Sequence, residues 1–132
     1  FHLPVHILDC REGMPSLQAA TDLPSLKEKA LILYTGNMYR NEYGSKAYFD
    51  ETDTSIEKET LLKILDKEPQ LILIDSYGIG KHGTHHITCE ASNCYVVENI
   101  RVAPEEVNDI QTIHVNFDLD YPSTGKPCTV TY

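Results

Sequence analysis

The chain has 132 residues, of which 41% are hydrophobic and 23% are charged, and these values predict a single compact domain spanning residues 1–132. Its 11 basic and 20 acidic residues give a formal charge of −9, which repels phosphate backbones and anionic membranes. The charge argues against a nucleic-acid partner, and no apolar run is long enough for membrane insertion. A protein partner fits this composition best, while the oligomeric state stays open.

Three continuous apolar runs lie at residues 5–9, 30–34 and 71–75, and segments of mixed polarity separate them. Continuous runs are typical of parallel strands that are buried on both faces of a sheet. We therefore expect an α/β fold with a small parallel sheet core and flanking helices.

Helix signals lie between these runs. Ser16 and Ser25 are candidate N-caps for one or two short helices within residues 16–29. Thr54 and Glu57 have the spacing of a capping box, which predicts a helix that ends at Pro69.

Residues 37–53 lack a clean period, and we predict a surface excursion with a short strand at 46–49. Tyr39, Tyr43 and Tyr48 lie in this segment. Tyrosine is enriched at protein interfaces, so these three are candidate binding residues.

The C-terminal third has a different texture. Polar and apolar residues alternate through residues 113–120, which is typical of a strand with one exposed face. We predict an antiparallel β extension here, with one helical turn within residues 103–110.

The densest group of reactive side chains lies between residues 82 and 94, and its members are His82, His85, His86, Cys89, Glu90 and Cys94. In a helix, the three histidines and Cys89 would share one face and bind a metal together. The local composition instead favours a hairpin, with residues 84–89 pairing with residues 94–98. A hairpin leaves His82, His86 and Glu90 as a three-ligand set for a divalent metal such as zinc or manganese, and His85 as a binding residue.

The four cysteines, at positions 10, 89, 94 and 128, allow three pairings. We favour Cys10 with Cys128 and Cys89 with Cys94, while four reduced thiols remain an equal alternative. Because the chain starts at Phe1, we also expect that it is processed from a longer precursor and is secreted or extracellular.

Carboxylates follow two of the predicted strands. Asp9 and Asp75 end their strands, and Glu12 comes three residues after Asp9. Since the carboxyl ends of parallel strands form one edge, these groups would converge there with the histidines. Convergent carboxylates and histidines can hold a divalent metal and activate water, so Asp9, Glu12 and Asp75 are candidate catalytic residues.

Three short segments each resemble a different family. HGTH at residues 82–85 resembles the histidine motif of subtilisin-like proteases, and KEKALILYTGN at 27–37 is similar to the active-site strand of rhodanese-like domains. REGMP at 11–15, with PQLILIDSYGIGKH at 69–82, resembles endonuclease V. Each segment implies a different fold, so none assigns the chain to a family.

Two functions follow from these patterns. The first is an extracellular or precursor-derived binding or assembly module that uses the His/Cys-rich hairpin or the tyrosine segment. The alternative is a small divalent-metal-dependent hydrolase with its ligands at the carboxyl edge of the sheet.

Overall fold

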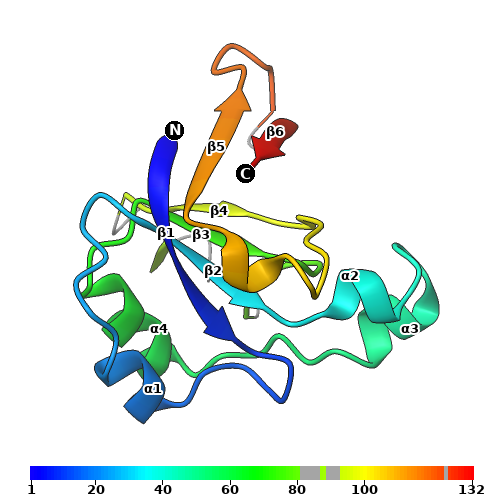
Figure 1. Cartoon of the computed structure of the whole chain (residues 1–132), viewed down its shortest axis with the longest axis horizontal. Coiled ribbons are helices and arrows are strands. Elements are labelled where there is room, and N and C mark those ends of the chain that lie inside the picture. The colour runs from blue at the N-terminus through cyan, green and yellow to red at the C-terminus, as the bar shows by residue number, and fades with distance from the viewer. Residues whose placement is uncertain (81–86, 89–92, 124) are drawn as a thin grey trace.

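The computed structural model describes residues 1–80, 87–88, 93–123 and 125–132, and it has a mixed α/β fold (Figure 1). Its six-stranded sheet has the order β4-β3-β2-β1-β5-β6. The strands are β1 (His2–Asp9), β2 (Ala30–Tyr34), β3 (Leu71–Ile74), β4 (Tyr95–Val97), β5 (Thr112–Phe117) and β6 (Cys128–Thr131). Strands β1 to β4 pair in parallel, whereas β5 pairs antiparallel with both β1 and β6.

The helices are short. They are α1 (Leu17–Thr21), α2 (Asn37–Arg40), α3 (Lys46–Asp50) and α4 (Lys58–Leu65), with one 3₁₀ turn, η2 (Val107–Asp109). Among the described residues, no helix is long and apolar enough to cross a membrane. The mixed α/β class is therefore confirmed, although the helices are smaller than the predicted flanking layers.

The two faces of the sheet pack against different parts of the chain. Leu31 and Leu33 of β2 face α1 and α4, while Ala30, Ile32 and Tyr34 face the opposite core. The second core is completed by residues from the segment after β4 and from β5, including Ile100, Val102, Val107, Ile110, Ile113 and Val115. Burial on both faces is the reason that β2 has an uninterrupted apolar sequence.

Strand β1 changes partners along its length. Residues from His2 to Pro4 pair with β5, whereas residues from Val5 to Asp9 pair with β2. Proline has no backbone N–H, so Pro4 suits the point where one ladder ends and the next begins. A strand shared in this way forms a corner between two parts of a sheet, and the sheet bends there.

Several local predictions are confirmed. Ser16 caps α1, because its Oγ accepts a hydrogen bond from the amide of Ala19 at 3.1 Å. Strand β2 occupies the predicted range, and β5 alternates between exposed and buried side chains. The predicted helical turn is η2.

Other local predictions are wrong. Residues 46–49 lie in α3 and not in a strand, because Ser45 caps a helix by accepting from the amide of Tyr48 at 3.2 Å. The helix for which Thr54 was the predicted cap is α4, and it begins after Glu57, so Thr54 does not cap it. Thr54 is instead buried, and its carbonyl accepts from the amide of Gly80 at 2.8 Å.

The predicted hairpin is also wrong where it can be seen. Ile87 and Thr88 are π-helical, and β4 pairs in parallel with β3. Strand β4 thus pairs with β3 and lies at the edge of the sheet. Residues 84–86 and 89 of the predicted hairpin lie outside the described residues.

The predicted disulfide between Cys10 and Cys128 is wrong. Both are free thiols, with Cys10 buried at the end of β1 and Cys128 exposed on the edge strand β6. Cys94 is buried below β4, and its predicted partner Cys89 lies outside the described residues.

Candidate binding pocket

The carboxyl ends of β2 and β3 are joined by the carboxylate of Asp75, which is 1% exposed. Its Oδ1 accepts from the amide and the hydroxyl of Thr35, both at 2.7 Å, and its Oδ2 accepts from the amide of Gly36 at 2.8 Å. Burial raises the pKa of Asp75, and the donors from Thr35 and Gly36 oppose that rise. Both carboxylate oxygens are thus occupied by the turn that follows β2.

The same end of the sheet has a second tier of buried polar contacts. Asn37 Nδ2 donates to the hydroxyl of Ser76 at 2.7 Å and to the carbonyl of Tyr48 at 2.9 Å. The Tyr48 hydroxyl donates to Asn99 Oδ1, and burial raises the pKa of Tyr48 to about 12. Among the described residues, no buried side-chain nitrogen or oxygen lacks a partner. This polar network therefore binds the loops to each other.

The other predicted carboxylates are exposed. Asp9 forms an ion pair with Arg11 at 2.7 Å, and the hydrogen bonds from Arg11 lower the pKa of Asp9. Glu12 is exposed in the following turn. Burial, together with the charges of Asp9 and Asp75, raises the pKa of the Cys10 thiol to about 12. Asp9 and Asp75 therefore both raise the pKa of Cys10, although Asp9 is exposed and Asp75 is buried.

The predicted metal ligands His82, His86 and Glu90, and the predicted binding residue His85, lie outside the described residues. Within the described part of the chain, no group of three or more His, Cys, Asp or Glu side chains could hold a metal ion. The predicted zinc or manganese site stays a prediction.

The predicted tyrosines lie in three different environments. Tyr39 is 44% exposed beneath the guanidinium of Arg101, whose central carbon is 4.4 Å from the ring centre. Tyr43 is 63% exposed, whereas Tyr48 is fully buried and belongs to the polar network. Only Tyr39 and Tyr43 are therefore accessible to a partner.

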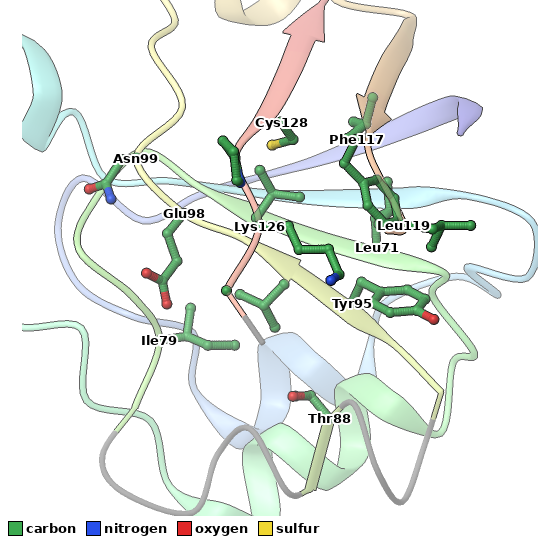
Figure 2. Close-up of a pocket in the computed structure, with 15 residues that line it drawn as sticks. Leu71, Ile79, Thr88, Tyr95, Glu98, Asn99, Phe117, Leu119, Lys126 and Cys128 are labelled. Carbon is green, nitrogen blue, oxygen red and sulfur yellow. The ribbon is translucent and has the colours of Figure 1, made fainter. Parts of the chain in front are cut away.

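A pocket of about 880 Å³ lies between the two edges of the sheet, and its lining includes residues of both cores. One wall comes from β4 and the start of β3, and the other from the end of β5 and the segment leading into β6 (Figure 2). Most of its lining is apolar, including Leu71, Ile79, Val97, Val115, Phe117 and Leu119. This size and composition are typical of ligand sites.

Aromatic contacts show how closely the two edges approach. The rings of Tyr95 on β4 and Phe117 on β5 lie 6.3 Å apart, although three strands separate β4 from β5 in the sheet order. Phe1 lies against both, at 5.8 Å from Tyr95 and 6.1 Å from Phe117. The bend at β1 therefore curls the sheet until its edges face each other across the pocket.

Polar side chains also line the pocket, among them Glu98, Lys126 and Asn99. Glu98 is an exposed residue, and partial desolvation raises the pKa of its carboxyl. Lys126 Nζ donates to the carbonyls of Tyr121 and Ser123 at 2.7 and 2.8 Å, which holds the chain before β6 in place. Asn99 follows Glu98 in the lining (Figure 2). Its Oδ1 accepts from the Tyr48 hydroxyl, which connects the pocket to the polar network.

Gly78 makes room for the Glu98 carboxyl. A Cβ at position 78 would lie 3.0 Å from Glu98 Oε1, and the φ of +145° at Gly78 disfavours other residues. The backbone after β3 can therefore pass directly over the Glu98 side chain.

Our sequence prediction missed this pocket. The alternating pattern of β5 does predict that Val115 and Phe117 share one face. This pattern does not predict that β4 approaches β5, because that approach depends on the curvature of the whole sheet.

No protein-family model matches the chain, and no curated protein is detectably similar to it.

Proposed function

We propose that the protein is a binding module, and that the pocket between the sheet edges receives an extended segment of a partner protein. The observation that carries the proposal is the apolar pocket with an edge strand on either side. An apolar cavity accounts for side-chain burial, and an open strand edge accounts for backbone pairing.

The edge of β4 supplies the backbone part of this proposal. The Tyr95 amide donates to the carbonyl of Gln70, which is on the side of β3. Because backbone groups alternate along a strand, the N–H and C=O of Val96 point away from β3. An added strand would use these groups, since unpaired edges are templates for further pairing.

Charge defines the chemistry of the partner segment. Glu98 places a carboxyl within the pocket, and the chain as a whole has a formal charge of −9. Both favour a segment that carries a lysine or arginine beside its apolar side chains. Lys126 already donates to two carbonyls, so it does not neutralise Glu98 through any contact seen here.

Selection from a displayed library of random peptides tests the proposal. We expect the selected peptides to combine apolar residues at alternate positions with one basic residue. Leu119→Lys places a positive charge on a pocket-lining side chain that is 73% exposed, and we expect it to weaken the binding of these basic peptides about tenfold or more. Leu17→Lys, on α1 and 43% exposed, is the matched control and should bind as the wild type does.

Val96→Pro tests the backbone contact separately. Proline removes the outward N–H of Val96 and is tolerated on edge strands where no ladder bond is lost. We expect weaker peptide binding with the fold retained in circular dichroism spectra. Equal binding by Leu119→Lys, Leu17→Lys and the wild type would contradict the proposed surface.

The alternative function is metal-dependent hydrolysis, and it depends on His82, His86 and Glu90, which lie outside the described residues. Metal analysis of the purified protein tests this alternative. A stoichiometric ion that is lost in His82→Ala would support it, and an ion content at background would exclude it.

A further inference from the structure

Two histidines outside the predicted cluster lie side by side on adjacent strands of the sheet. His2 of β1 and His114 of β5 are directly opposite in the antiparallel register, and both are exposed. Their rings are stacked, with centres 4.4 Å apart and planes inclined by 28°. They lie on the face opposite to Leu3 and Ile113, which point into the second core.

The backbone beneath this pair is firmly held. The nitrogen of Phe1 donates to the carbonyl of Val115 at 2.7 Å, and the amide of Val115 donates to the carbonyl of Phe1 at 2.8 Å. These two bonds continue the β1–β5 ladder next to the histidines. The side chains therefore project from a rigid base, which reduces the entropy lost when they bind one ligand.

We propose that His2 and His114 form a two-histidine site for a divalent transition metal, with zinc as the ion that fits best. Cβ atoms of directly opposite residues on antiparallel strands are about 4.5–5.5 Å apart. Zinc is bound by imidazole nitrogen at about 2.0–2.1 Å, so the two rings would turn out of their stacked arrangement until one nitrogen of each faces the same ion.

The chemistry of the site follows from its two ligands. Neutral imidazole suits zinc, nickel and copper, whereas magnesium and calcium prefer oxygen ligands. Two protein ligands leave about two tetrahedral positions for water or for a side chain of another molecule. The site is thus open, and it is distinct from the three-ligand set predicted at His82, His86 and Glu90.

Zinc titration followed by NMR of the histidine side chains tests the proposal. We expect the imidazole signals of His2 and His114 to shift together, at a shared apparent affinity. His114→Gln removes one ligand while keeping a polar side chain, and the zinc affinity reported by His2 should then fall about tenfold or more.

His6→Gln is the matched control, because His6 lies on the same strand but pairs with Leu31 and has no facing histidine. It should leave the response of His2 and His114 unchanged. Any zinc bound at residues 82–90 would move other signals, so the two sites are read separately. Unshifted signals of His2 and His114 at saturating zinc, or an unchanged affinity in His114→Gln, would overturn the proposal.

Discussion

The buried network around Asp75 and the pocket between the sheet edges differ in what surrounds their carboxylates. At the carboxyl end, Asp75 is surrounded by donors from the chain itself, and both its oxygens are occupied. Between the sheet edges, Glu98 lines an apolar pocket that is open to a ligand. Polar groups at strand ends suggest a catalytic edge. The carboxylate of Asp75 is instead used to hold the turn after β2, whereas the pocket is available for binding.

The largest effect on stability is expected from Asp75→Ala, which removes the carboxylate that joins the ends of β2 and β3. It leaves the buried amides of Thr35 and Gly36 without their acceptor, and each buried unsatisfied donor costs about 1–3 kcal/mol. We expect the free energy of unfolding in urea to fall by about 4 kcal/mol. Asp9→Asn is the control, since its exposed ion pair contributes little, and a comparable loss there would contradict this contrast.

Tyr48→Phe probes the link between the two regions. It removes the hydroxyl that donates to Asn99, so it disconnects the polar network from the pocket wall. A buried hydrogen bond contributes about 1 kcal/mol, and we expect a loss of that size in chemical denaturation. Tyr43→Phe, at an exposed ring beside Tyr48, should cause no measurable loss.

Glu98→Gln separates stability from binding. Because burial raises the pKa of Glu98 in the folded state, the charged form disfavours folding, and stability falls as the pH rises through the unfolded and then the folded pKa. The variant should lose that pH dependence and gain about 0.5 kcal/mol or less at neutral pH. It should also weaken the binding of basic peptides, and lower stability at neutral pH would contradict this view.

The smallest expected effect is a difference in the labelling rates of the thiols, which involves no change in the free energy of unfolding. Burial raises the pKa of both thiols, to about 12 for Cys10, but Cys128 is exposed beside the pocket whereas Cys10 is only 4% exposed. A maleimide should therefore label Cys128 before Cys10 in the native protein. Mass spectrometry of the labelled peptides checks this order, and a bound peptide in the pocket should slow the labelling of Cys128.

Much of the fold could be predicted from local signals. The uninterrupted apolar run of β2 and the alternation of β5 come from burial on two faces and on one face. The strand predicted at residues 46–49 was wrong. Its aromatic residues favour a strand, yet the Ser45 cap starts a helix there. Local propensity is weak when a cap competes with it.

The site depended on features that no short segment contains. Asp75 was singled out correctly as lying at a strand end, but its donors are about 40 positions away in sequence, at Thr35 and Gly36. The pocket needs Tyr95 and Phe117 to meet, although β3, β2 and β1 lie between their strands in the sheet. The extracellular setting stays a prediction, since it rests on the chain's start and on cysteine usage.

The most direct test of the central claim is backbone NMR during titration with a selected peptide. We expect the largest shifts at residues 95–99, at Phe117 and at residues 126–128, which line the pocket. The exposed aromatic residues of the α2–α3 segment, Tyr39, Tyr43 and Phe49, should keep their signals. Shifts confined to that segment, with the pocket signals unchanged, would contradict the account.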